Sequence, residues 1–153
     1  GSKEKADLVR SHGCDYPILY KEENFVERVR EITAGEGVDV VYDSVGKDTF
    51  LQSLDCLKPL GMLALFGQSS GTVDSFDPSL LAGKGSLFLT RPTLMNYVAK
   101  RDDLESTAME LFDMIGQGIV NPDIRQERPL QEAAKAHRDL ESRRTMGATI
   151  LIP

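Results

Sequence analysis

The sequence contains no tryptophan, and only two cysteines and two histidines occur among its 153 residues. Cys14 and Cys56 belong to no CxxC pair and to no cysteine and histidine set with the spacing of zinc ligands. The pattern therefore favours two buried, reduced thiols, because an unpaired cysteine usually packs as a small hydrophobic residue. No Ser/His/Asp or Cys/His set for nucleophilic catalysis is evident, so we predict no catalytic side chain here.

Long apolar runs and an excess of basic residues are also absent. The longest apolar runs, such as Met62 to Phe66, are far too short to span a bilayer, and no basic-then-apolar leader opens the chain. The net charge is −6, whereas nucleic-acid binding needs a basic surface. We therefore expect a cytoplasmic globular protein that binds neither membranes nor nucleic acids.

A phosphate-binding glycine turn is missing as well. The chain has no GxGxxG or GxxxxGK[ST] motif. Gly35-Glu36-Gly37 and Gly83-Lys84-Gly85 have the wrong length, and both precede predicted strands instead of helices. These motifs alone therefore do not demonstrate nucleotide binding.

Two short apolar segments, Val38–Asp43 and Gly61–Gly67, indicate buried strands. Their near-continuous apolarity is typical of strands that are covered on both faces of a parallel sheet. Between them, one face of a predicted helix carries Phe50, Leu54 and Leu57. Lys58-Pro59 is predicted to end this helix, so the three segments form a βαβ unit.

The flanking segments continue the alternation of helices and strands. Asn24 with Glu27 is predicted to cap one helix, and Asp102 with Glu105 to start another that closes at Gly118. Further predicted elements are helices at Lys3–His12 and Leu130–Glu141, and strands at Pro17–Tyr20, Ser86–Thr90, Ile124–Glu127 and Ala148–Ile152. The pattern predicts an α/β fold, a Rossmann-like parallel sheet with helices on both faces.

The order of the predicted helices and strands also predicts the domain organisation. The chain begins in the middle of the alternation, so we expect a Rossmann-like sheet truncated at its N-terminal side, and Gly1-Ser2 resembles a cloning remnant. Residues 1–120 are predicted to form a partial dinucleotide-binding domain. Residues 121–153 break the alternation and are predicted to return to a different structural unit.

Candidate ligand contacts lie where predicted strands end, because ligands of open parallel sheets bind across the carboxyl ends of the strands. This rule points to Tyr20, Asp43–Gly46 and Phe66–Ser70. Gly46 and Gly67 suit either a simple turn or a close backbone approach to a ligand. Asp43 suits a structural carboxylate that satisfies loop amides better than a catalytic one, since no second acid or histidine lies nearby in the sequence.

Several uncommon sequence motifs, in the order in which they occur along the chain, carry a family resemblance. They are Gly37–Gly46 (GVDVVYDSVG), Ser53–Leu57 (SLDCL), Phe66-Gly67, Lys84–Pro92 (KGSLFLTRP) and Ala136–Arg143 (AHRDLESR). This set resembles the medium-chain dehydrogenase/reductase superfamily, most closely its zinc-free, zeta-crystallin-like quinone oxidoreductase branch. The resemblance covers essentially the whole chain.

The resemblance implies an enzyme that passes hydride from NADPH to a quinone. It implies that Lys5 and Tyr20 contact the adenosine end of NADPH, Lys5 through the 2′-phosphate, and that Arg143 helps to hold the cofactor. It further implies that Ser44, Val45 and Gly46 pass beneath adenine and ribose, and that the nicotinamide end is lined by Phe66, Gly67 and Ser69.

The resemblance also implies a homodimer joined through the strand Ser86 to Thr90. The glycine turn that holds the pyrophosphate would lie upstream of Gly1, so we expect the isolated chain to bind the cofactor poorly and to be inactive. Other readings stay open: an enone reductase or alcohol dehydrogenase of the same superfamily, or a non-catalytic nucleotide-binding or scaffold module.

Overall fold

The computed structural model describes residues 2–122, 124–142 and 145–153. These residues form two compact units, one ending at Asn96 and the other beginning at Tyr97. The first unit contains helices α1 (Lys3–Ser11), α2 (Phe25–Ile32), α3 (Phe50–Asp55) and α4 (Ser79–Gly83), and strands β1 (Val38–Asp43), β2 (Leu57–Leu65) and β3 (Phe88–Thr90). A short helix, α5 (Leu94–Tyr97), lies at the junction.

The first unit is built on a three-stranded parallel sheet in the order β1-β2-β3. The register aligns Val40 with Met62 and Met62 with Phe88, so these three side chains share one face. They are 40 to 55% exposed. The order places β3 at an edge of the sheet, and the predicted α/β class with parallel strands is confirmed.

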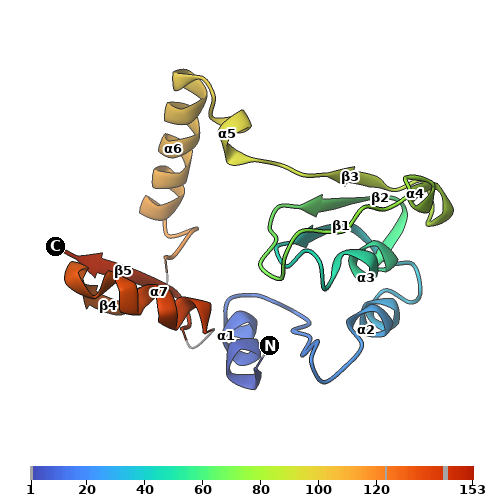
Figure 1. The fold of residues 1–153 in the computed structure, drawn as a ribbon, viewed down its shortest axis with the longest axis horizontal. Helices are drawn as coiled ribbons and strands as arrows, with labels where there is room; N and C mark the ends of the chain where they lie inside the picture. The colour runs from blue at the N-terminus through green and yellow to red at the C-terminus, as the bar shows by residue number, and fades with distance from the viewer. Residues whose placement is uncertain (1, 123, 143–144) are drawn as a thin grey trace. The chain divides into compact units, whose positions relative to one another are not determined.

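The opposite face of this sheet carries the hydrophobic core. Leu63 is fully buried between the strands and α3, which contributes Phe50 and Leu54. Phe50 also packs against Phe76, with ring centroids 5.0 Å apart. Figure 1 shows α2 and α3 on this same side of the sheet. The core thus fixes the carboxyl ends of β1 and β2, from which the candidate site is built.

Helix α2 begins as its sequence predicts. The Asn24 side chain accepts hydrogen bonds from the backbone N–H groups of Val26 and Glu27, which satisfies two donors of the first turn. At the other end, the Arg30 guanidinium donates to the carbonyls of Gly35 and Asp55, at 2.8 and 2.7 Å. Arg30 thereby ties α2 to the turn between α3 and β2.

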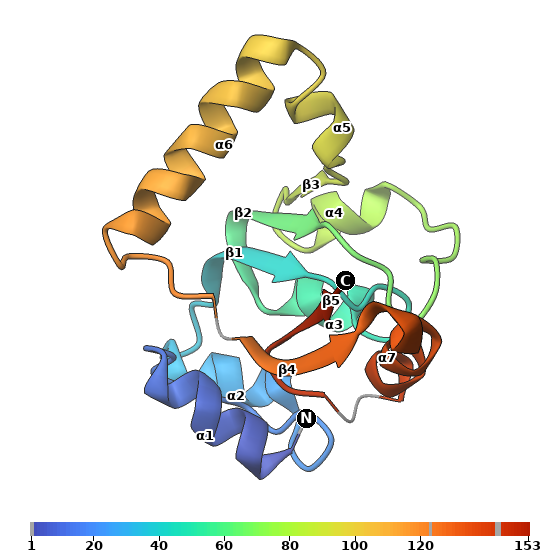
Figure 2. The same cartoon turned by 90° about the vertical axis from the view of Figure 1, so that its left-hand side faces the viewer.

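The second unit contains α6 (Arg101–Gly116), β4 (Ile124–Pro129), a short 3-10 helix (Leu130–Glu132), α7 (Ala133–Glu141) and β5 (Ala148–Ile152). Strands β4 and β5 pair in parallel, and α7 lies beside them (Figures 1 and 2). Arg128 on β4 joins these elements, because its guanidinium contacts Asp139 at 2.7 Å and Glu132 at 3.3 Å. No helix among the described residues has the length and apolarity needed to cross a membrane.

Several predicted boundaries around the first sheet are wrong. The strand predicted at Gly61–Gly67 is β2, Leu57–Leu65, and the strand predicted at Ser86–Thr90 is confined to β3, Phe88–Thr90. Helix α3 ends at Asp55, and Leu57 opens β2 instead of closing the helix, since it pairs with Val38. Pro17–Tyr20 forms no strand. Pro17 has no N–H to donate, and the Leu19 backbone is used locally, by the Glu23 carboxylate and by a turn to Glu22.

Two further predictions about single residues are also wrong. Helix α6 begins at Arg101, so Asp102 lies in its first turn, where a carboxylate suits the helix dipole, and not at the cap. Cys14 is exposed, because it directly follows the turn at Gly13 and lies outside any helix or strand, whereas Cys56 is buried as predicted.

Candidate functional site

A cavity of about 290 Å³ opens at the carboxyl end of β1 in the first unit. Its lining includes Tyr20, Ser44 and Val45, three residues that the sequence proposed as ligand contacts. The cavity is mostly apolar with a few polar groups, a combination that suits an aromatic ring carrying polar substituents.

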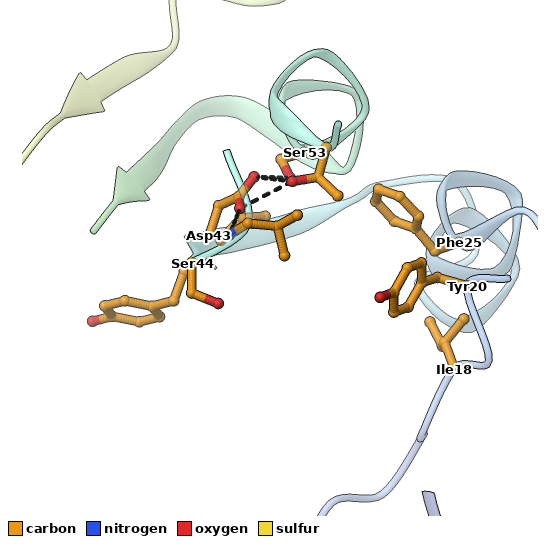
Figure 3. A pocket seen from close by; sticks show the side chains of 10 residues that line it. Ile18, Tyr20, Phe25, Asp43, Ser44 and Ser53 are labelled. Carbon is orange, nitrogen blue, oxygen red and sulfur yellow. Dashed lines mark hydrogen bonds between the residues drawn. The ribbon is translucent and has the colours of Figure 1, made fainter. Parts of the chain in front are cut away.

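Apolar side chains from outside the sheet form one wall of this cavity. Figure 3 shows Ile18, Tyr20 and Phe25 grouped together, facing Asp43, Ser44 and Ser53 across the cavity. Phe25 opens α2, so the Asn24 cap that starts the helix also fixes this wall. Tyr20 is 43% exposed, which leaves its ring accessible to a ligand.

Asp43, the last residue of β1, organises the opposite wall. It is only 4% exposed, and its carboxylate accepts hydrogen bonds from the backbone N–H groups of Val45 (2.7 Å) and Gly46 (3.1 Å). The hydroxyls of Thr49 and Ser53 donate to it as well, each at 2.8 Å. Burial raises the pKa of Asp43, but these four donors outweigh it and hold the pKa below its ordinary value. Asp43 is therefore a structural anion, as the sequence favoured.

Two glycines allow the loops after β1 and β2 to touch. A Cβ atom on Gly67 would lie 2.4 Å from the Ser44 carbonyl oxygen. Gly46 has φ +89°, and a Cβ there would lie 2.8 Å from the Gly71 carbonyl oxygen. Both glycines are thus required by loop packing, whatever else they contact.

Comparison with known proteins assigns the family. Residues 12–151 match the family described as zinc-binding dehydrogenase. The chain belongs to this dehydrogenase family. The match spans both compact units.

Relatives of this dehydrogenase chain are quinone and acrylate reductases. It is 45% identical to quinone oxidoreductase 1 of Escherichia coli and 44% identical to a 2-haloacrylate reductase of Burkholderia, over 100% and 99% of its own length. It covers 47% and 46% of those relatives, so it spans about half their length. The predicted resemblance to quinone oxidoreductases is confirmed.

Solved structures agree with this assignment. The Escherichia coli quinone oxidoreductase in complex with NADPH superposes with a TM-score of 0.95 at 45% identity, over 100% of this chain and 48% of the other. The 2-haloacrylate reductase superposes with a TM-score of 0.88 at 44% identity, over 99% and 48%.

The family description names zinc, but the described residues of the dehydrogenase chain do not form a zinc site. Within residues 2–122, 124–142 and 145–153, no three His, Cys, Asp or Glu side chains lie close enough together to hold a metal ion. Cys56 is unsuited as a ligand in its own right, because burial raises the pKa of its thiol to about 11, with Asp55 adding and Arg30 opposing.

The other sequence-predicted contacts of the dehydrogenase chain do not line this cavity, and one of them lies outside the described residues. Lys5 lines a neighbouring cavity, which shares Ile18 with the first. Phe66 is half exposed beyond the end of β2, and the Ser69 N–H donates to the Ser44 carbonyl at 3.1 Å. Arg143 lies outside the described residues.

Some lining residues were missed by reasoning from sequence. Ile18 and Phe25 are ordinary apolar residues in the sequence, but they flank Tyr20, and that proximity was an available signal. Tyr42 also lines the cavity and is 76% exposed. Its exposure was not predictable from strand periodicity, because the near-continuous apolarity of Val38–Asp43 indicates a strand that is buried on both faces.

Proposed function

We propose that this chain is the cofactor-binding portion of an NADPH-dependent quinone reductase, which transfers hydride from NADPH to a quinone. The observation that carries the proposal is the cavity at the end of β1, where Tyr20, Ser44 and Val45 meet. The similarity to a quinone oxidoreductase in complex with NADPH supports it.

Each proposed contact has a defined task. Tyr20 contacts the adenosine end, and Ser44, Val45 and Gly46 support adenine and ribose from below. Lys5, in the adjoining cavity, supplies the positive charge for the 2′-phosphate, and Arg143 helps to hold the cofactor. Phe66, Gly67 and Ser69 line the nicotinamide end.

The proposed chemistry needs orientation more than reactive side chains. Bound NADPH supplies the hydride, so this chain holds the dinucleotide in place and needs no covalent nucleophile. We assign residues 1–120 to the dinucleotide-binding domain and residues 121–153 to a segment that returns to the catalytic domain. The proposal includes a zinc-free, cytoplasmic enzyme whose isolated C-terminal portion is inactive.

Cofactor binding is tested with two variants of the full-length reductase. We expect Lys5→Glu and Tyr20→Ala to weaken NADPH binding by about tenfold or more, since each removes a contact worth on the order of 1–2 kcal/mol. Lys3→Glu is the matched control, because it makes the same charge change on α1 at a residue that does not line the cavity. Unchanged affinity in both test variants would remove the adenosine assignment.

The edge position of β3 supports a proposed homodimer. Phe88 on this strand is 55% exposed, and an open apolar edge invites pairing with a second chain. We expect a dimeric mass by light scattering at roughly tens of micromolar protein. We expect Phe88→Lys to yield monomers, because a charged side chain on an edge strand opposes pairing with a second chain; a monomeric wild type would refute the proposal.

Reduction of an activated carbon–carbon double bond is the second candidate function. The 44% identity to a 2-haloacrylate reductase favours it specifically. Initial rates of NADPH oxidation with 1,4-benzoquinone and with 2-chloroacrylate distinguish the two. Turnover with the quinone alone supports the first proposal, and turnover with the acrylate alone replaces it with the second.

A further inference from the structure

Two loops provide the two ends of the proposed cofactor site. The β1 loop, Ser44–Lys47, follows β1 and contains the residues proposed to support adenine and ribose, Ser44, Val45 and Gly46. The β2 loop, Gly67–Gly71, follows β2 and contains two of the proposed nicotinamide contacts, Gly67 and Ser69. The relative position of these loops therefore sets the spacing between the two halves of the site.

Backbone hydrogen bonds join the loops at three points. The N–H groups of Ser69 and Ser70 donate to the carbonyls of Ser44 (3.1 Å) and Val45 (2.9 Å), and the Lys47 N–H donates back to Gly71 (3.2 Å). The absence of a Cβ on Gly46 and Gly67 permits this approach. The loops are thus in direct contact along their length.

The Ser70 side chain adds a second set of bonds to the same contact. Its hydroxyl donates to the Val45 carbonyl at 2.8 Å and accepts from the Asp48 N–H at 3.0 Å. The Ser70 side chain therefore forms hydrogen bonds with two backbone groups of the segment that follows β1, one on each side of Gly46. Ser70 lines neither of the two cavities described above.

We propose that Ser70 is a positioning residue that fastens the β1 loop to the β2 loop, so that the two ends of a bound dinucleotide meet subsites of fixed spacing. This inference rests on the proposed function. A two-part ligand binds more tightly than its halves only to the extent that both subsites are held at the spacing of the ligand. Loosening the loops removes that advantage without removing either set of contacts.

Ser70→Ala in the full-length reductase tests the inference. Three ligands are compared: NADPH, adenosine 2′,5′-bisphosphate for the adenosine end, and reduced nicotinamide mononucleotide for the other end. Dissociation or inhibition constants are measured for each, and the melting temperature is recorded. Ser75→Ala is the matched control, since Ser75 lies in the same connection and is exposed.

We expect Ser70→Ala to weaken NADPH by about tenfold while each half-ligand changes by less than about twofold, because linkage and not contact is lost. Unchanged NADPH affinity in Ser70→Ala would refute the inference alone. Parallel weakening of all three ligands with a lowered melting temperature would also refute it, in favour of a general structural role. A wild-type enzyme that binds no NADPH would refute the proposed function, and this inference with it.

Discussion

Asp43 stabilises the fold as a buried anion with four hydrogen-bond donors. We expect Asp43→Asn to lower the free energy of unfolding at pH 7 by about 2–3 kcal/mol, since a neutral amide accepts these bonds less well and brings unwanted donors. Urea unfolding measures the effect. Asp48→Asn, at an exposed position nearby, is expected to change stability by less than about 0.5 kcal/mol.

The same carboxylate predicts a pH dependence with a definite sign. The pKa of Asp43 is lowered in the folded state, so its contribution is fully present above the unfolded-state pKa of about 4 and is lost as the pH falls through the lowered value. We expect the wild type to lose more stability than Asp43→Asn between about pH 5 and pH 2. Equal losses would contradict the account.

The two cysteines are predicted to differ in reactivity. Cys14 is exposed, while Cys56 is 3% exposed with its pKa raised to about 11, which keeps its thiol protonated at pH 8. We expect a disulfide reagent to label Cys14 in the folded chain and Cys56 only in denaturant. Native labelling that persists in Cys14→Ser would contradict this.

The sequence predicted the role of a single residue correctly where that role depends on its neighbours in the chain. The structural role of Asp43 was predictable, because an aspartate that ends a strand has loop amides beside it in the chain. The exposure of Cys14 was not, because burial depends on which element covers a residue. The Ser70 bridge joins residues 22 and 25 positions apart, and no local pattern marks it.

At the scale of elements, strand β2 contains a locally strained backbone. Leu60 has φ +63°, its side chain is 67% exposed, and its N–H donates to Gly85. We expect Leu60→Gly to raise the free energy of unfolding by about 0.5–1 kcal/mol, because glycine adopts this conformation without the clash that a Cβ brings.

Leu51→Gly is the matched control for this prediction. Leu51 is also exposed, at 56%, but it lies inside α3, where glycine costs about 1 kcal/mol of helix stability. The two variants should therefore shift the melting temperature in opposite directions. A loss of stability in both would show that the Leu60 side chain contributes more than the strain removes.

Prediction of the elements succeeded for β1 and β5, whose bounds follow the apolar runs, and for the start of α2, which the Asn24 cap marks. The helix predicted at Leu130–Glu141 begins instead as a 3-10 helix, and α7 starts at Ala133. Prediction was wrong at Pro17–Tyr20, whose composition suits a strand but which has no ladder partner among the described residues. Strand formation depends on a neighbour that local sequence does not specify. The end of α3 was misplaced because the Arg30 contact with Asp55, 25 residues away, helps to set it.

At the scale of the whole molecule, the α/β class could be predicted from the alternation of helices and strands. The family could be predicted from several sequence motifs in their order along the chain. The cavity itself did not follow from the sequence, because Tyr20 and Val45 meet only in the folded unit. The proposed roles therefore combine a local signal, residues at strand ends, with a tertiary arrangement that the structure supplies.

The central claim, a site built for NADPH, is tested most directly by the cofactor preference of the full-length reductase. The measurement is kcat/KM for NADPH and for NADH with 1,4-benzoquinone, in the wild type and in Lys5→Glu. The account predicts that the wild type prefers NADPH by at least about tenfold, since one charged phosphate contact is worth more than 1.4 kcal/mol, and that Lys5→Glu loses this preference. Equal use of NADPH and NADH by the wild type, or a preference unaffected by Lys5→Glu, would contradict it.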